Sequence, residues 1–122
     1  MSNHRVSSEK HIGIVISTSK GFRNADTTKE ILNGLEEEQV PYWIDSDILQ
    51  TDDMVKMAYQ AACRSVFGVG LCCSEKGVVI HHSKLKKNMP LFYCSGRCSS
   101  EKARQIGEDA ARLVQGLPFN NI

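Results

Sequence analysis

A short apolar run at residues 11–17 (HIGIVIS) constrains the fold of this chain more than any other feature. Its centre, Ile14, Val15 and Ile16, has three successive β-branched side chains, which are typical of β-strands. A strand without alternation between polar and apolar residues has no face suited to water, so we expect it to be buried on both sides. The run therefore predicts a strand inside a parallel or mixed sheet.

The rest of the chain alternates helical patterns with further apolar runs. The capping box Thr27-x-x-Glu30 predicts a helix that runs through Leu35, and Pro41 prevents its continuation. Helix caps at residues 51–53 and at Ser100 predict two more helices, the second ending at Gly116. Further strands are predicted at residues 42–44, 66–72, 77–81 and 90–94, and the short connection at 73–77 predicts a hairpin.

The resulting order of elements, β-α-β-α-β-β-β-α, defines the expected fold class. It predicts a single α/β domain of two or three layers at residues 11–122, with a mixed, mostly parallel sheet of about five strands and about three helices. Residues 1–10 are polar, and we expect them to form a flexible N-terminus. A length of 122 residues fits one compact domain.

Composition excludes several classes of partner. The formal net charge is +1, which gives no electrostatic basis for binding nucleic acid. No apolar run approaches the roughly 20 residues that span a bilayer, and the first residues lack the apolar core of a signal peptide. We therefore expect a cytoplasmic protein with no nucleic-acid or membrane partner.

Five cysteines are present: Cys63, Cys72, Cys73, Cys94 and Cys98. An odd number, with two adjacent and several in apolar runs, favours reduced thiols over a disulfide framework. Cys94 and Cys98 together with His81 and His82 could form a zinc site, but their spacing matches no standard finger or ribbon. Paired histidines at a strand end are more often surface or hydrogen-bonded structural residues than acid–base groups.

The chain shows no self-sufficient active site. The loop at residues 17–21 follows the first strand, where many α/β folds bind phosphate, but it lacks the spacing of a phosphate-binding or dinucleotide-binding turn. Asp45 and Asp47 could chelate a hard cation, although a turn is the simpler interpretation. We therefore expect that this chain alone catalyses no reaction and binds no cofactor.

A run of three glutamates, Glu36, Glu37 and Glu38, stands where the first helix ends. The C-terminus of a helix carries partial negative charge, so acidic side chains are locally unfavourable there. Two interpretations remain: a solvated helix face, or an interface site. Since Ile31 and Leu35 belong to the buried face, the helical period points Glu37 almost directly away from it. Glu37 is thus the carboxylate best placed to reach another molecule.

Four segments, read together, show a family resemblance: residues 34–42 (GLEEEQVPY), 58–62 (AYQAA), 90–92 (PLF) and 109–119 (DAARLVQGLPF). Residues 68–70 and 79–82 lie between these blocks in the same order. The chain resembles the small (beta) subunit of the diol/glycerol dehydratase reactivating factor, which is similar to the medium subunit of the dehydratase. The resemblance runs from about residue 11 to the C-terminus, and the combination of segments carries more weight than any single one.

The resemblance implies a function and partners. It implies a large partner subunit with ATPase activity, and a complex that releases damaged cobalamin from inactivated adenosylcobalamin-dependent dehydratase by exchanging subunits with the dehydratase large subunit. It also implies that Glu37 lies beside a divalent ion, magnesium, held mainly by the large subunit. The alternatives are the dehydratase medium subunit itself and an unrelated α/β protein-binding module. The preference for glycerol or propane-1,2-diol dehydratase and association with a bacterial microcompartment stay open.

Overall fold

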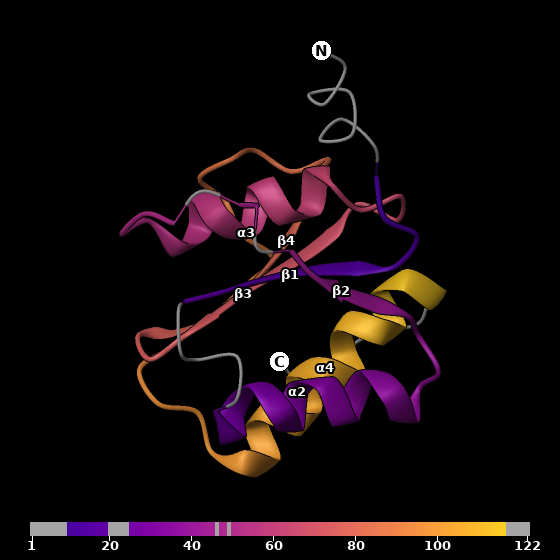
Figure 1. Cartoon of the computed structure of the whole chain (residues 1–122), viewed down its shortest axis with the longest axis vertical. Coiled ribbons are helices and arrows are strands. Elements are labelled where there is room, and N and C mark those ends of the chain that lie inside the picture. The colour runs from indigo at the N-terminus through magenta and orange to yellow at the C-terminus, as the bar shows by residue number, and fades with distance from the viewer. Residues whose placement is uncertain (1–9, 20–24, 46, 49, 117–122) are drawn as a thin grey trace.

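The computed structural model describes residues 10–19, 25–45, 47–48 and 50–116. The predicted order of elements is confirmed (Figure 1). Three helices and five strands follow one another along the chain: β1 (Ile14–Thr18), α2 (Asp26–Glu37), β2 (Tyr42–Ile44), α3 (Met54–Cys63), β3 (Val69–Ser74), β4 (Gly77–His82), β5 (Phe92–Ser95) and α4 (Ser100–Gln115).

The strands form one mixed sheet in the order β2-β1-β3-β4-β5. The β1 strand pairs in parallel with β2 and with β3, whereas β3–β4 and β4–β5 are antiparallel. The expected hairpin joins β3 to β4, with Ser74 opposite Gly77. Half of the pairings are therefore parallel, so the expectation of a mostly parallel sheet needs correction, because β5 also returns antiparallel through a connection too short for a crossover helix.

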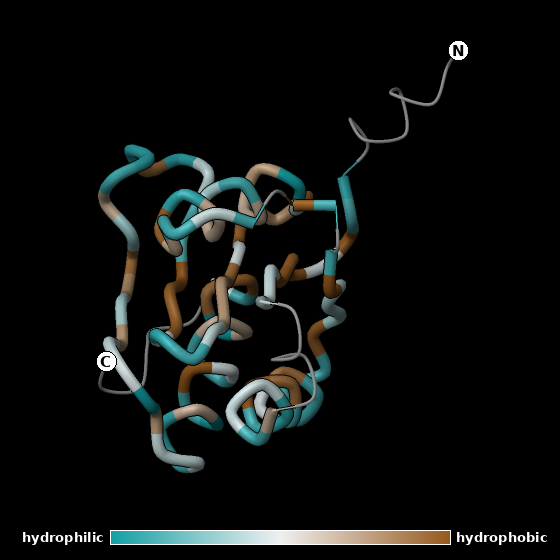
Figure 2. The backbone as a smooth tube through the Cα atoms, turned by 60° about the vertical axis from the view of Figure 1, so that its left-hand side comes forward, coloured by the Kyte–Doolittle hydropathy of each residue, from teal (hydrophilic) through white to brown (hydrophobic). Residues whose placement is uncertain are grey.

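Helices cover both faces of the sheet (Figure 1), with α3 on one face and α2 and α4 together on the other. The β1 strand sends Ile14 and Ile16 into the core beneath α2 and α4, and Val15 into the core beneath α3. All three side chains are fully buried, which confirms that the strand is buried on both sides. Figure 2 shows the same arrangement, with hydrophobic stretches of backbone gathered between the helical layers.

The α2 and α4 helices approach each other through glycine. A Cβ atom built on Gly107 would lie 2.1 Å from the carbonyl oxygen of Ile31, and one on Gly34 would lie 2.4 Å from the carbonyl oxygen of Arg104. Both contacts are to backbone, which cannot rotate away as a side chain can. The two glycines therefore let the helices lie side by side at a distance that no larger residue would permit, and they position the α2 C-terminus against α4.

Some predicted boundaries were wrong. The α2 helix begins at Asp26 and has no side-chain cap hydrogen bond at Ala25, so the expected capping box at Thr27 does not form. The last helix is capped one residue earlier than expected, by Ser99, whose Oγ accepts from the backbone N–H of Lys102 at 3.1 Å. The Asp53 cap of α3 and the end of α4 at Gly116 are confirmed.

The N-terminal strand is also shorter than predicted. His11 lies outside β1 and meets Ser65 in an isolated bridge, while its ring stacks on Trp43 with 4.8 Å between centroids. Most of the expected flexible N-terminus, residues 1–9, lies outside the described residues. Within the described part of the chain, no helix is long and apolar enough to cross a membrane.

Candidate functional site

The C-terminal turn of α2 presents the three glutamates in three different settings. The helix ends in a Schellman motif: Gln39 adopts a left-handed conformation with φ of 59°, and its N–H donates to the Glu36 carbonyl. The N–H of Val40 donates to the Leu35 carbonyl at 3.1 Å. This motif ends the helix before Pro41, so proline is not what stops it.

Glu36 is held toward β2. The hydroxyl of Tyr42 donates to its Oε2 at 2.7 Å. This hydrogen bond is the main cause that raises the pKa of Tyr42 above its ordinary value. Because its carboxylate is tied to the strand that follows the helix, Glu36 helps join α2 to β2.

Glu37 is about half exposed, at 51%, and turns toward α4. Arg104 forms hydrogen bonds to both of its carboxylate oxygens: Nε donates to Oε1 at 3.2 Å, and Nη2 donates to Oε2. The same guanidinium reaches Glu30, two turns earlier on α2, with 3.3 Å between Nη1 and Oε1. Hydrogen bonding by Arg104 lowers the pKa of Glu37, so this carboxylate stays ionised. The prediction that Glu37 is exposed is confirmed, but it is ion-paired within its own chain.

Further acid surrounds this ion pair. Glu108 lies one turn after Arg104 on α4, and its pKa is raised by partial burial, then by its hydrogen bond with Glu37 and by the nearby charges of Glu37 and Glu38. Arg104 thus pairs with Glu30 and Glu37, and the carboxylates of Glu108 and Glu38 add further negative charge beside it. We call these five residues the carboxylate cluster.

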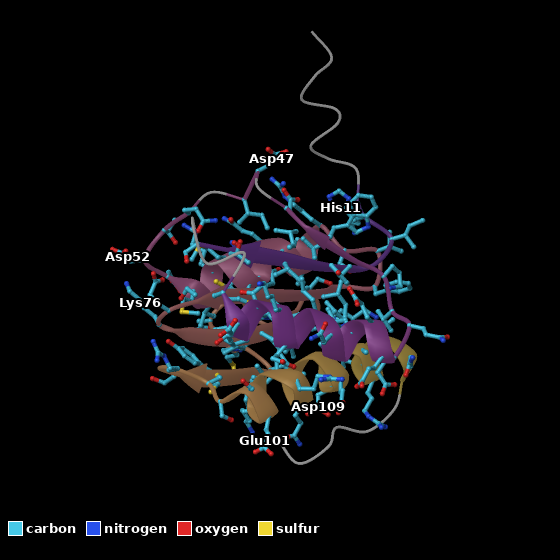
Figure 3. All side chains as sticks on the ribbon, turned by 60° about the horizontal axis from the view of Figure 1, so that its bottom comes forward. His11, Asp47, Asp52, Lys76, Glu101 and Asp109 are labelled. Atoms are coloured by element: carbon cyan, nitrogen blue, oxygen red, sulfur yellow. The ribbon has the colours of Figure 1, made fainter. Side chains whose placement is uncertain are left out.

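The cluster borders an open hollow of about 480 Å³ that Glu30, Arg104 and Glu108 line together with Ser100, Glu101 and Gln105. Figure 3 shows α2 and α4 side by side, with Glu101 at the beginning of α4 and Asp109 further along it. All of the residues that line the hollow belong to α2 or α4.

A divalent cation could bind at this surface only if another molecule supplied most of its ligands. No group of three or more His, Cys, Asp or Glu side chains that could hold a metal ion occurs among the residues that the structure describes. Glu37 offers an exposed, ionised carboxylate of the kind that magnesium prefers, while Arg104 already occupies its oxygens. This chain could supply one oxygen ligand, and the remaining ligands would have to come from elsewhere.

The other candidate residues have structural roles. His81 is fully buried: its Nδ1 accepts from the N–H of His82 at 2.9 Å, and its Nε2 donates to the carbonyl of Lys87 at 3.0 Å. The Nδ1 of His82 accepts from the N–H of Lys84. Both histidines thus organise the loop after β4, which confirms the structural interpretation of this pair.

Asp45 forms the expected turn. Its Oδ1 accepts from the N–H of Asp47 at 2.8 Å, and its Oδ2 accepts from Arg64 at 2.9 Å and lies 3.5 Å from His11. Burial raises the pKa of Asp45, but the hydrogen bonds from Arg64 and Asp47 outweigh it and leave the pKa lowered. A carboxylate already satisfied by these donors serves the fold.

The loop at residues 17–21 is only partly described. Ser17 is buried and its Oγ accepts from Gln50 Nε2 at 3.2 Å, while residues 20–24 lie outside the described residues. The expectation that this loop binds no phosphate stays a prediction.

Arg104 is the functional residue that sequence reasoning missed. It lies 67 residues from Glu37. The sequence nevertheless indicates that Arg104 could reach a neighbouring helix. Ala103, Ile106 and Ala110 mark the buried face of α4, so Arg104 falls at the edge of that face, where a long cation can reach a neighbouring helix.

Comparison with known proteins defines the class. The dehydratase medium subunit family matches residues 12–120, so the chain belongs to this family. Within it, the chain is 37% identical over 106 residues to the propanediol dehydratase-reactivating factor small subunit of Citrobacter freundii, covering 87% of this chain and 88% of that protein. The small subunit of the same name from Salmonella typhimurium is 37% identical over 93 residues, covering 76% of this chain and 78% of that protein.

Solved structures agree with these relatives. A diol dehydratase-reactivating factor complexed with ADP and Mg²⁺ contains a chain that matches with a TM-score of 0.79 and 32% identity, covering 92% of this chain and 100% of that chain. A glycerol dehydratase reactivase matches with a TM-score of 0.78 and 25% identity, covering 91% and 98%. The fold and the relatives together identify this chain as similar to reactivating-factor small subunits.

The raised pKa of Glu108, caused first by partial burial and then by the neighbouring acids, predicts a pH effect on stability. The folded-state pKa of Glu108 lies above its ordinary value of 4.5, so the unfolded chain releases this proton first as pH rises. The free energy of unfolding should therefore fall as pH rises from the ordinary pKa of 4.5 through the higher folded-state pKa of Glu108. Glu108→Gln should stabilise the chain at pH values above this range but not below it. The gain should stay under about 0.5 kcal/mol because water screens a largely solvated carboxylate.

Urea unfolding at a series of pH values measures this difference. The matched control is Glu101→Gln on the same helix, which should lower stability slightly because a helix N-terminus favours acidic side chains. A Glu108→Gln variant that is less stable than the wild type at neutral pH would show that the cluster carries no excess of negative charge.

Proposed function

We propose that this chain is the small, non-catalytic subunit of a dehydratase-reactivating factor and that it acts by docking to a larger subunit. The observation that carries the proposal is the family match over residues 12–120, because the family takes its name from the dehydratase medium subunit. A chain with the fold of that subunit can occupy its place. The relatives named as reactivating-factor small subunits support the choice of this role within the family.

The proposed mechanism is subunit exchange. The larger partner binds and hydrolyses ATP, and the small subunit moves between that partner and the large subunit of an adenosylcobalamin-dependent diol or glycerol dehydratase. When it takes the place of the medium subunit, the cobalamin site opens and damaged cobalamin leaves. The ADP and Mg²⁺ of the structurally similar complex support a nucleotide site in the assembly. Action in the cytoplasm, with or without a microcompartment, belongs to the same proposal.

Glu37 is the residue proposed to act at the interface with the larger subunit. Its carboxylate would donate one oxygen to a magnesium ion whose other ligands come from the partner, and the ion would join the two chains by charge. The excess of carboxylates in the cluster supports this role, because a divalent cation relieves their mutual repulsion. Arg104 holds Glu37 ionised until the ion replaces it.

An apolar patch is proposed to contribute to docking. Ile12, Trp43, Val66 and Phe67 are exposed, with Ile12 at 67% and Val66 at 54%. The N–H of Val66 donates to the carbonyl of His11, whose ring stacks on Trp43, so Val66, Trp43 and Ile12 lie around the residues that lead into β1. Large exposed apolar side chains gathered in this way are typical of surfaces that bind another protein.

Co-expression tests the function. The tagged chain should co-purify with the larger subunit of its reactivating factor, and ATP hydrolysis should appear in the complex, while titration of the isolated chain with Mg-ATP should give no heat of binding. The alternative role, the medium subunit of the dehydratase, predicts stable co-purification with a catalytic large subunit. That result, or micromolar binding of Mg-ATP by the isolated chain, would overturn the proposal.

A further inference from the structure

Two of the five cysteines meet in space. The Sγ atoms of Cys94 and Cys98 lie 2.7 Å apart, while an S–S bond is about 2.05 Å long. All five cysteines are free thiols in this structure. Two thiols this close need only a small movement to form a covalent bond.

Rigid elements on both sides hold the pair. Cys94 belongs to β5, where alternate residues turn inward, and it packs against the same core in which Cys98 is buried. Between them Gly96 adopts the left-handed conformation with φ of 79°, and its N–H donates to the carbonyl of Lys76 at 2.8 Å. The tight turn brings the chain back to the Ser99 cap of α4. The proximity of the two thiols is therefore fixed by a strand end and a helix start.

Of the other three cysteines, only Cys73 shares the core of Cys94 and Cys98, where burial and then the charges of Cys72 and Cys98 raise its pKa. Cys72 and Cys73 are adjacent in sequence but belong to the cores on opposite faces of the sheet. Cys63 is exposed at the end of α3, which covers the face opposite α2 and α4. Cys63 and Cys72 thus serve as internal controls for any chemistry at Cys94 and Cys98, while the buried Cys73 is followed separately by peptide mapping.

We propose that Cys94 and Cys98 form a reversible dithiol–disulfide site that low-molecular-weight disulfides such as oxidised glutathione oxidise. The thiolate of Cys94 attacks one sulfur of the small disulfide and releases one small thiolate, leaving a mixed disulfide on Cys94. Cys98 then attacks the Cys94 sulfur, gives its proton to the second departing thiolate, and completes the internal disulfide. Two protein thiols are oxidised and one small disulfide is reduced to two thiols.

The settings of the two sulfurs assign their order of reaction. Cys94 is half-buried and accepts the S–H of Cys98, which is only 7% exposed, so Cys94 is the more accessible of the two sulfurs. Burial is the main cause that raises the pKa of Cys98 to about 12, with the contact to Cys94 adding to it and the charge of Lys102 opposing it. Cys94 is therefore the attacking sulfur and Cys98 the resolving one.

The test uses the full chain in a Cys63→Ser background, which removes the exposed lone thiol. The protein is equilibrated with glutathione buffers of increasing oxidised fraction, quenched with an alkylating reagent and measured by intact mass and peptide mapping. The expected product has lost the mass of two hydrogen atoms, carries no glutathione and maps to residues 94 and 98, and dithiothreitol reverses it. Cys72 and Cys73 should stay reduced, and they should react with the alkylating reagent only after the protein is denatured.

Single substitutions separate the two steps. Cys98→Ser should accumulate glutathione on Cys94, because the resolving thiol is gone, whereas Cys94→Ser should show neither an adduct nor an internal disulfide. Circular dichroism checks that each variant is folded, and Cys98→Ala replaces Cys98→Ser if it is not. A parent chain that keeps both thiols in the most oxidised buffer, or that collects glutathione adducts without ever losing two hydrogens, would overturn the proposal without bearing on the role in reactivation.

Discussion

Replacing Gly107 with alanine should destabilise the isolated chain, although the same change in an ordinary helix stabilises it. In a helix interior, alanine is more favourable than glycine by about 1 kcal/mol of folding free energy. Here the new Cβ would lie 2.1 Å from the carbonyl oxygen of Ile31, so α2 and α4 must separate along their contact. Overpacking of this kind costs about 1–3 kcal/mol, occasionally more, and the upper end applies because backbone must move. We expect a net loss of roughly 1–2 kcal/mol and a Tm lower by at least about 4 °C.

Urea unfolding and thermal melts measure this loss. Gly34→Ala should show the same effect, since its Cβ would lie 2.4 Å from the carbonyl oxygen of Arg104. The matched control is Asn33→Ala, which shortens an exposed side chain beside Gly34 to a methyl group and should stabilise α2 slightly. If Gly107→Ala behaves like Asn33→Ala, the two helices are not in backbone contact.

Much of the fold could be predicted from local pattern. The run at Ile14, Val15 and Ile16 indicated a strand buried on both faces, and the structure places those side chains in two separate cores. The Asp53 cap and the Gly116 end were found because a single residue type satisfies a backbone requirement at each place. Features that depend on a few neighbouring residues are thus recoverable from sequence.

Features that depend on distant residues were not recoverable. Sequence spacing gave the outward direction of Glu37 but could not show that Arg104 would meet it, because the helical period describes one helix at a time. The direction of β5 was missed although the expected connection at residues 82–89 is too short for a parallel crossover, which needs a dozen or more residues. The capping box failed because Thr27 lies inside the first turn, after Asp26 has already begun the helix. Tertiary packing decided the first of these points, whereas the other two depend on the local sequence.

The second prediction concerns the affinity of this chain for the larger subunit. If Glu37 gives an oxygen ligand to a magnesium ion at the interface, Glu37→Gln should weaken magnesium-dependent assembly by at least about tenfold, the lower end of what loss of even an outer partner costs a metal site. The Tm of the isolated chain should hardly change, because an exposed ion pair contributes little to stability. Titration calorimetry with the larger subunit, with and without Mg²⁺, measures this effect.

Arg104→Gln should change magnesium dependence in the opposite direction. In the free chain the guanidinium occupies both oxygens of Glu37, so an incoming cation must displace it. Without that competitor, half-maximal assembly should need less magnesium, while Glu36→Gln should have little effect because the Tyr42 hydroxyl already holds the Glu36 carboxylate toward β2. A general loss of surface charge would not make Glu37→Gln and Arg104→Gln change the magnesium dependence of assembly in opposite directions. If both variants shift assembly in the same direction, or if Glu36→Gln matches Glu37→Gln, the glutamates act only as a solvated face and the cation ligand lies elsewhere.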